Sequence, residues 1–323
     1  MAPPTITILS AMSFPRSAAK PCTRRADAAS GRMTRSMATL AGFGAILLWA
    51  TLALFTTLSG AMPPLQLLAM CFTIGGGMGL VAGARRRGWR SWRQPWPVWA
   101  LGVGGLFGYH LLYVLALRAA PPVQASLIAY LWPLLIVLLA TRVTGERLRW
   151  HHLCGALLGL AGAALIVTGG RGIDVSADHA PGYAIAYVAA FFWAGYSVLS
   201  RRVASVPTDA VTGFCLATSG LSALAHLALE ETVWPQGVEW LAVLGLGLGP
   251  VGLAFFLWDI GVKRGDLPVL GAASYAAPLL STLVLIGTGQ AEATWVVGAA
   301  CLLITGGAAL AAKDMFSKGP RSG

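Results

Sequence analysis

The residues best suited to bind a small molecule are polar-tipped aromatic side chains in the middle of long apolar runs. Tyr113 lies four residues after Tyr109 and three after His110, so it shares a helix face with both. Buried phenol, indole and imidazole groups need hydrogen-bond partners, and a central cavity that holds water or substrate provides them. Aromatic packing between helices is the alternative interpretation. The predicted substrate-binding residues are Tyr109, His110, Tyr113, Tyr130, Trp132, Trp193, Tyr196, Ser274 and Tyr275.

The charge at the centres of these runs limits the substrate. No Lys or Arg lies there, which argues against phosphorylated sugars because a phosphate needs a cation. An uncharged aromatic cavity suits a zwitterion, whose ammonium can lie over a ring face. His110 is the only basic ionisable group near the centre, and a functional and a structural imidazole both remain open. Asp259 lies four residues before Lys263, so an ion pair within one helix explains it.

Two prolines stand at matching places in the apolar runs. Pro133 and Pro278 each precede Leu-Leu and follow a tyrosine by three residues. Proline removes a backbone donor and clashes with the preceding turn, so it kinks a helix. Carbonyl groups freed at a kink can line a polar cavity. We predict that both prolines are kink points involved in gating; an ordinary kink without function is the alternative.

Other chemistry has little support in the sequence. It contains no Walker-type loop, no paired carboxylates at the centre of a run and no His/Glu metal set, so we expect neither a cofactor nor a metal. The five cysteines have no metal-type spacing, and we assign no disulfide. We therefore do not expect an enzyme.

The apolar runs define the elements that carry these residues. Hydrophobic residues make up 56% of the 323, and charged residues only 11%, against about 25% in soluble domains. Runs of about 20 apolar residues can cross a bilayer, and helices are the form that satisfies their own backbone there. We predict an all-α polytopic membrane protein with ten spans, at residues 38–59, 64–84, 97–117, 123–141, 153–170, 182–199, 210–229, 238–261, 267–288 and 293–312.

The net charge of +11 reflects membrane topology. With the N-terminus inside, 21 of the 23 Lys and Arg residues fall in inside segments, leaving only Arg118 and Arg171 outside. Cytoplasmic loops carry such an excess of basic residues. We predict both termini in the cytoplasm and a lipid bilayer as the partner, with no nucleic-acid binding. Trp96, Trp99, Trp234, Trp240 and Trp295 lie near span ends and fit interfacial anchors.

The chain also repeats itself. A shift of 145 residues places Tyr130 and Pro133 on Tyr275 and Pro278, and a shift of 144 places Trp49 on Trp193. Each repeat has five spans, and an odd number gives the two repeats opposite orientations in the membrane. We predict a basic, disordered cytoplasmic tail at 1–36, five-helix repeats at 37–171 and 182–313, and a cytoplasmic tail at 314–323. The Gly-x-x-x-Gly motifs at 75–79 and 155–159 fit contacts within the molecule, so we favour a monomer.

These features resemble the EamA-type branch of the drug/metabolite transporter superfamily over residues 38–312. The doubled five-span unit, Trp49 and Trp193, the two Pro-Leu-Leu segments and the turn at 144–148 carry the resemblance. The second repeat lacks that turn, with Gly-Gln-Ala-Glu at 289–292. The Tyr109-His110-x-x-Tyr113 cluster with Tyr130-x-Trp132-Pro133 is similar to exporters of aromatic amino acids. The resemblance implies export of small metabolites through the bacterial inner membrane.

We therefore expect an exporter of amino acids with aromatic or large apolar side chains that works by alternating access. The acidic residues fall in loops, in the tail or near span ends, and burial disfavours a charged imidazole. A neutral site that binds a zwitterion moves no net charge, so we expect a facilitator. A proton-coupled exporter of another small neutral metabolite or drug is the alternative. An intramembrane lipid-modifying enzyme and a non-transporting receptor are weaker alternatives.

Overall fold

The described part of the chain is helical, as the apolar runs predict. The computed structural model describes residues 33–84, 88–144, 148–173 and 176–313. The helical bundle lies within residues 35–313. Within the described residues, nine helical stretches are long and apolar enough to cross a membrane, and a shorter tenth spans Trp295–Ala311. Residues 1–32 of the predicted N-terminal tail, the predicted tail at 314–323 and the centre of the turn at 144–148 lie outside the described residues, whereas residues 35 and 36 already belong to the first helix.

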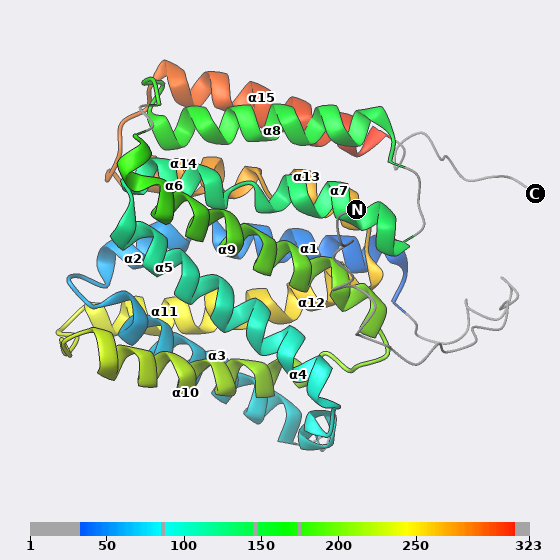
Figure 1. Cartoon of the computed structure of the whole chain (residues 1–323), viewed down its shortest axis with the longest axis vertical. Coiled ribbons are helices and arrows are strands. Elements are labelled where there is room, and N and C mark those ends of the chain that lie inside the picture. Colours follow the sequence, from blue (N-terminus) through cyan, green and yellow to red (C-terminus); the bar gives the residue numbers. More distant parts are fainter. Residues whose placement is uncertain (1–32, 85–87, 145–147, 174–175, 314–323) are drawn as a thin grey trace, which may run out of the picture. The chain divides into compact units, whose positions relative to one another are not determined.

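Several spans consist of two helical pieces, which Figure 1 shows as separately labelled helices. The first repeat contains α1 (Arg35–Trp49), α2 (Leu52–Leu58), α3 (Pro64–Ala84), η1 (Gly88–Trp92), α4 (Trp96–Val103), η2 (Gly104–Gly108), α5 (Tyr109–Ala119), α6 (Pro122–Ala129), α7 (Trp132–Thr144) and α8 (Trp150–Thr168). The second contains η3 (Ala177–His179), α9 (Ala180–Leu199), η4 (Ser200–Val203), α10 (Ala210–Leu229), α11 (Glu239–Leu248), η5 (Gly249–Leu253), α12 (Ala254–Arg264), α13 (Leu267–Ala273), α14 (Ala276–Gly287) and α15 (Trp295–Ala311).

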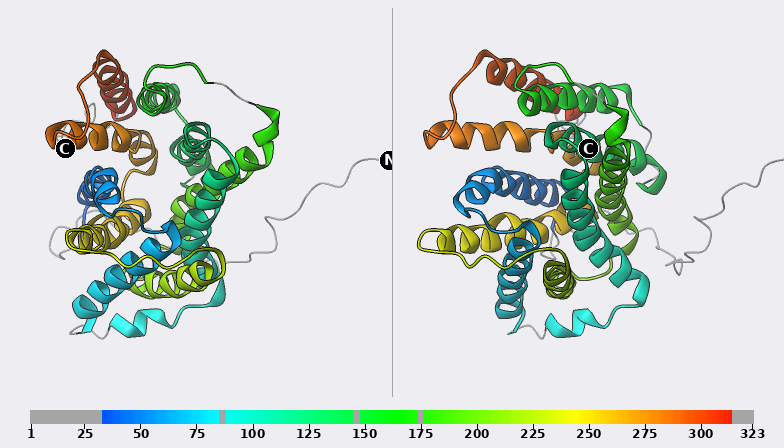
Figure 2. Two further views of the ribbon diagram at one scale, coloured as in Figure 1. Left: turned by 90° about the vertical axis from the view of Figure 1, so that its left-hand side faces the viewer. Right: turned by 60° about the vertical axis from the view of Figure 1, so that its left-hand side comes forward.

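The internal repeat predicted from the sequence is confirmed by the helices. The π-helical turns η2 and η5 begin at residues 104 and 249, which are 145 positions apart. Repeat-related helices also pack on one another: α3 against α10, and α8 against α15. The pair α1–α12 is the repeat image of the pair α9–α5, and both are close contacts. In the views of Figure 2, α8 and α15 run side by side at one edge, and α3 and α10 run together at the other.

Glycines allow the closest of these approaches. A Cβ atom added to Gly155 would lie 2.5 Å from the carbonyl oxygen of Gly307, so no larger residue fits between α8 and α15. One added to Gly75 would lie 2.9 Å from Cα of Gly252. Small residues permit such backbone contact between membrane helices. Both Gly-x-x-x-Gly motifs therefore make contacts within this molecule.

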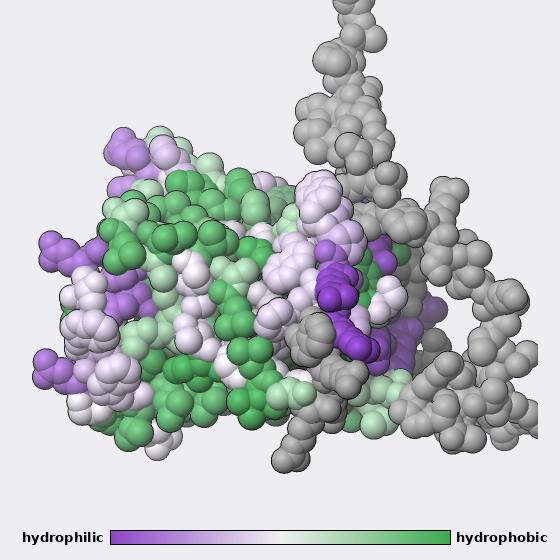
Figure 3. Space-filling view, turned by 90° about the horizontal axis from the view of Figure 1, so that it is seen from below, coloured by the Kyte–Doolittle hydropathy of each residue, from purple (hydrophilic) through white to green (hydrophobic). Residues whose placement is uncertain are grey.

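The two ends of the bundle are named here after Glu230 and Asp266, which lie in connections at opposite ends. Figure 3 shows an apolar band across the middle of one face, with hydrophilic residues gathered toward the ends. Trp96, Trp234 and Trp295 are 71%, 69% and 73% exposed, which suits indoles at a membrane interface.

Candidate solute-binding site

A cavity of about 390 Å³ lies between the two repeats. Small-molecule sites are concave, largely apolar and begin at about 300 Å³. Aromatic rings supply most of its wall, and a few hydroxyl groups supply the polar part. The lining residues are Trp49, Leu52, Ala53, Tyr109, His110, Tyr113, Ser126, Ala129, Tyr130, Trp132, Ile166, Trp193, Pro250, Val251, Phe255, Ala277, Pro278, Ser281, Thr282 and Leu285.

Interrupted helices surround this cavity. The α1–α2, α6–α7 and α13–α14 junctions and the π turn η5 all contribute lining residues or adjoin them. The helix breaks at residues 130–131 and 274–275 lie within one helical turn before Pro133 and Pro278. Irregular backbone at membrane depth is tolerated where it is buried in protein or lines a cavity. Discontinuous helices at the interface of two repeats are also where transporters bind their substrates.

Five aromatic residues pack around the base of the cavity: Trp49, Trp132, Trp193, Trp258 and Phe255. The Trp49 ring centre lies 5.9 Å from that of Trp193, 6.3 Å from that of Trp132 and 5.0 Å from that of Trp258. Trp258 is fully buried, and its indole N–H donates to Ser197 Oγ at 3.0 Å. The indole N–H of Trp49 donates to the Pro250 carbonyl oxygen at 3.1 Å. Edge-to-face and tilted contacts of this kind favour a rigid arrangement of the rings.

Tyrosines of α5 and the α6–α7 junction form another part of the wall. The rings of Tyr109 and Tyr113 are stacked with their centres 6.0 Å apart, as their spacing on one helix face predicts. The Tyr113 hydroxyl lies 2.9 Å from Ser126 Oγ. Tyr130 lines the cavity from the residue that follows α6. The cavity therefore has hydroxyl groups beside aromatic faces.

His110 lines the same cavity in a defined orientation. Its Nδ1 lies 2.6 Å from the carbonyl oxygen of Leu106, which can only accept, so Nδ1 is the donor. In a neutral imidazole, Nε2 is then a hydrogen-bond acceptor. The ring packs edge-on against Phe72 and Phe255, with centres 5.5 and 6.1 Å away. His110 thus has a structural hydrogen bond and a place in the cavity wall.

Four predicted site residues do not line the cavity. Tyr275 is fully buried, and its hydroxyl accepts a hydrogen bond from the backbone N–H of Leu134 at 3.1 Å. The Ser274 hydroxyl donates to the Leu270 carbonyl of its own helix at 2.7 Å. Tyr196 is 2% exposed and packs behind Trp193, and Pro133 is buried at the start of α7. Ser274, Tyr275 and Pro133 lie at or beside the helix breaks, whereas Tyr196 lies within α9.

The sequence interpretation missed several lining residues. Trp49 was noted only as a mark of the repeat, although its repeat mate Trp193 was predicted in the site. Phe255 lies 145 positions after His110, so the repeat could have found it. Ser281 and Thr282 lie one helical turn after Pro278 and could have been found from that proline. Ser126 had no comparable signal.

The predicted ion pair of Asp259 and Lys263 is confirmed and lies outside the cavity lining. Their charged groups are 2.9 Å apart, with side chains 1% and 4% exposed. Thr208 donates to the other carboxylate oxygen at 2.8 Å, and Lys263 also donates to the Val206 carbonyl at 3.0 Å. Buried charges persist when they are paired and hydrogen-bonded in this way. Across the described residues, no three His, Cys, Asp or Glu side chains are grouped to hold a metal.

The cavity extends from the centre of the bundle toward the Glu230 end. Leu52 belongs to α2, and Ile166 and Leu285 lie close to the ends of α8 and α14 that face this side. In the opposite direction, Trp258 and the buried Asp259–Lys263 pair fill the space. Beyond them, Arg201 donates to the Gly265 carbonyl at 2.8 Å, and Asp266 pairs with Arg35 at 2.8 Å. Among the described residues, these side chains lie between the cavity and the Asp266 end.

A helical membrane bundle of two inverted repeats with a cavity between them defines a membrane transporter. The model of the EamA-like transporter family matches residues 36–168 and 180–312, and the chain belongs to that family. The chain is 57% identical over 282 residues to the aromatic amino acid exporter YddG of Ancylobacter novellus, covering 86% of this chain and 98% of that protein. It is 25% identical over 290 residues to the Escherichia coli protein of the same name, covering 86% and 97%. A solved crystal structure, 56% identical, superimposes with a TM-score of 0.83 and covers the same shares as the first relative.

Proposed function

We propose that this transporter exports amino acids with aromatic or large apolar side chains. The observation that carries the proposal is a central cavity walled by Trp, Tyr and Phe rings, in which His110 is the only ionisable basic residue. An aromatic side chain gains apolar burial and ring contacts there. The absence of Lys and Arg from the lining disfavours phosphorylated solutes. Exporters of aromatic amino acids among the relatives support the same class.

The cavity suggests how such a substrate lies. We place its side chain against the rings of Trp49, Trp193 and Phe255 at the base. The hydroxyls of Tyr109 and Tyr130 can donate to the carboxylate, since a phenol is both donor and acceptor. The ammonium can bind His110 Nε2 and the faces of neighbouring rings. Neutral hydroxyl groups, an imidazole and ring faces thus bind the two charges of the zwitterion, and no charged side chain is needed.

Transport follows by alternating access. The conformation described here has its cavity toward the Glu230 end, and the repeat supports a second conformation in which the roles of the two halves are exchanged. Because the substrate is bound between the halves, the change from one conformation to the other moves its access from one side of the membrane to the other. We infer that Pro133 and Pro278 act as gating positions, because each follows a helix break beside the site.

The Glu230 end is assigned to the outside of the bacterial inner membrane, with both termini in the cytoplasm. The split of basic residues between the two sets of connections supports this orientation. Reporter fusions after Leu58, Ala84 and the last residue test it. We expect cytoplasmic reporter activity after Ala84 and at the C-terminus, and external activity after Leu58. A C-terminus outside would overturn the assignment.

We propose that the substrate gradient alone drives export. With a neutral His110, the lining residues carry no formal charge, so a bound zwitterion adds no net charge to the cycle. Efflux from proteoliposomes is measured with and without an imposed pH gradient, in wild type and His110→Gln. We expect no concentrative transport in either protein. Concentration driven by the pH gradient in wild type, and lost in His110→Gln with binding retained, would make His110 the coupling residue.

The function itself is tested by reconstitution into proteoliposomes. We expect labelled Phe, Trp or Met to cross faster than through protein-free vesicles, and unlabelled aromatic amino acids to compete. Movement of a phosphorylated sugar or an organic dication without movement of Phe, Trp or Met contradicts the proposal. Conversion of lipid in the same vesicles would support the enzyme alternative instead. Size-exclusion chromatography with light scattering tests the expected monomer.

A further inference from the structure

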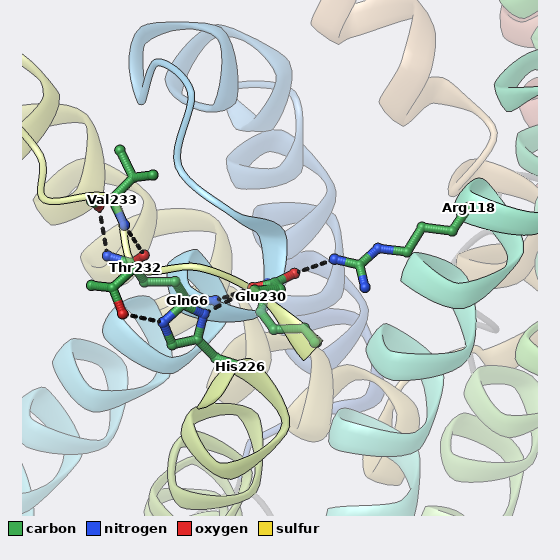
Figure 4. Close-up of polar contacts among 7 residues, drawn as sticks. Gln66, Arg118, His226, Glu230, Thr232 and Val233 are labelled. Atoms are coloured by element: carbon green, nitrogen blue, oxygen red, sulfur yellow. Dashed lines mark hydrogen bonds and ion pairs between the residues drawn. The ribbon is translucent and has the colours of Figure 1, made fainter. Parts of the chain in front are cut away.

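A buried carboxylate at one end of the bundle joins three helices. The Glu230 side chain, immediately after α10, is 2% exposed. It accepts from the backbone N–H groups of Leu65 and Gln66 in the first turn of α3, at 3.0 and 3.1 Å. It also lies 2.8 Å from the guanidinium of Arg118 at the end of α5, as Figure 4 shows. A carboxylate at a helix N-terminus satisfies free amides and the helix dipole together.

Further hydrogen bonds hold this carboxylate in place. His226 Nδ1 lies 3.1 Å from Glu230, and its Nε2 lies 2.9 Å from Thr232 Oγ1. The Gln66 side chain exchanges two hydrogen bonds with the Val233 backbone, at 2.7 and 2.9 Å (Figure 4). Glu230 is therefore a fixed point between α3 and α10. Arg118, which is 43% exposed, is the one member of this cluster that comes from α5.

The helix that Arg118 ends carries part of the cavity wall. Tyr109, His110 and Tyr113 stand at the start of α5, directly after the π turn η2. In a π turn the backbone hydrogen bonds join residues five apart instead of four, and such turns often occur at functional sites. Each residue of an α-helix turns the next side chain by about 100°, so a small change of register at η2 would turn the tyrosines away from the cavity. Fixing α5 at its far end opposes such a rotation.

The second repeat contains the same arrangement. Lys263 is the repeat image of Arg118, 145 positions later, and it ends α12, which follows the π turn η5. Its ammonium is held by Asp259 and the Val206 carbonyl. A basic residue that is fixed on buried acceptors thus ends the helix after each π turn. Two unrelated sets of acceptors serve the same position, which argues that the anchor itself matters.

We infer that Arg118 and Glu230 are positioning residues for substrate recognition. Their ion pair fixes the rotation of α5 so that Tyr109, His110 and Tyr113 face the cavity. The role in recognition rests on the proposed function, whereas the rotation does not. Arg118 acts through the tyrosines and makes no contact with substrate.

The first experiment measures transport kinetics of full-length protein in proteoliposomes. Displacing binding groups by about 1 Å can cost up to 100-fold. We expect Arg118→Ala to raise KM for Phe by about tenfold with a smaller change in the maximal rate, and Arg118→Lys to recover part of it. Arg171→Ala removes the other arginine that the predicted topology places on this side; Arg171 is exposed, so this variant is the matched control. Arg118→Ala with the same KM as Arg171→Ala contradicts the inference.

The second experiment needs no substrate. In a background without native cysteines, Tyr113→Cys is labelled by a membrane-impermeant maleimide through the cavity, and Leu112→Cys is the neighbouring position on another face of α5. We expect Arg118→Ala to lower the labelling rate at position 113 severalfold and to raise it at 112. Glu230→Gln should act in the same direction, and the double variant should add little, as for one coupled pair.

Unchanged labelling at both positions overturns the rotation, whatever the substrate is. Failure of wild type to move amino acids, with labelling changed as expected, overturns only the proposed function.

Discussion

The two sides of the central Trp49–Trp193 pair are built from repeat-related positions but differ in bulk. Toward the Asp266 end, the pair contacts Trp132 and Trp258, with ring centres 5.0–6.3 Å apart. The repeat images of these two residues are Ala277 and Tyr113, and both line the cavity on the other side. The indoles of Trp132 and Trp258 therefore fill the space on one side. The smaller side chains of Ala277 and Tyr113 leave the equivalent space open on the other side. Repeat-related positions thus carry packed indoles on one side and line the cavity on the other.

The largest effect is expected from filling the open side. Ala277→Trp places in the cavity the side chain that its repeat image carries at the sealed side. Transport of Phe should fall to the level of protein-free vesicles, while the midpoint of thermal unfolding in detergent stays near that of wild type. The added ring occupies the existing cavity of about 390 Å³ and so does not overpack a filled core. Transport at the wild-type rate would show that this cavity is not the path.

Emptying the sealed side should cost both stability and transport. Trp132 is 6% exposed, and replacing a buried Trp by Ala typically costs about 3–5 kcal/mol. Trp132→Ala should lower the unfolding midpoint strongly and reduce Phe transport, because the base of the site is lost. Trp96→Ala removes an indole that is 71% exposed and is the control. Equal effects of the two substitutions would remove the distinction between site and anchor.

The repeat-related tyrosines give a smaller and more selective contrast. Tyr275→Phe leaves the Leu134 N–H without its partner, which should cost about 1–3 kcal/mol of stability. Tyr130→Phe removes a hydroxyl in the cavity wall, so KM should rise while the unfolding midpoint changes little. Unfolding midpoints and transport kinetics of both variants separate the roles. A higher KM in Tyr275→Phe only would reverse the assignment of the two residues.

The smallest effect is expected at the outer part of the seal. Arg35 pairs with Asp266, but the two side chains are 48% and 18% exposed. Exposed ion pairs typically contribute about 0–1 kcal/mol. Arg35→Ala should shift the unfolding midpoint slightly and leave Phe transport within about twofold of wild type, since the indoles and the Asp259–Lys263 pair still close this end. A large gain in labelling of a cysteine at position 197 from the Asp266 side would show that Arg35 is essential to the seal.

The sequence predicted the helical class and the repeat because both rest on composition and spacing along the chain. Positions 130, 133, 275 and 278 were recognised as equivalent, and the helix breaks fall beside them. Their side chains diverge: Tyr130 lines the cavity, whereas Tyr275 binds the backbone of α7. Which image faces the cavity depends on the asymmetric conformation of the two halves. A symmetric sequence pattern could not distinguish them.

Contacts between distant helices were also beyond the sequence analysis. Acidic residues were expected in loops, in the tail or near span ends, yet the carboxylate of Glu230 is 2% exposed because α3 and α5 both supply donors to it. The sequence predicted Lys263 as the partner of Asp259, but not that both side chains are buried, at 1% and 4% exposed. Partners for such groups come from segments more than 50 residues away, such as Thr208 for Asp259 and Arg118 for Glu230. Spacing along one helix reveals only the i,i+4 partner.

The matched π turns bear on the ancestry of the chain. A π turn is a rare departure from helical geometry, and here η2 and η5 each occupy five residues at the same place in the two repeats. Independent origin at equivalent positions is a poor explanation for two such rare features. The turn therefore belongs to the five-helix unit that the chain contains twice. Because an odd number of spans reverses the second copy, the two turns enter the membrane in opposite senses, so the same local irregularity is present in both orientations within one chain.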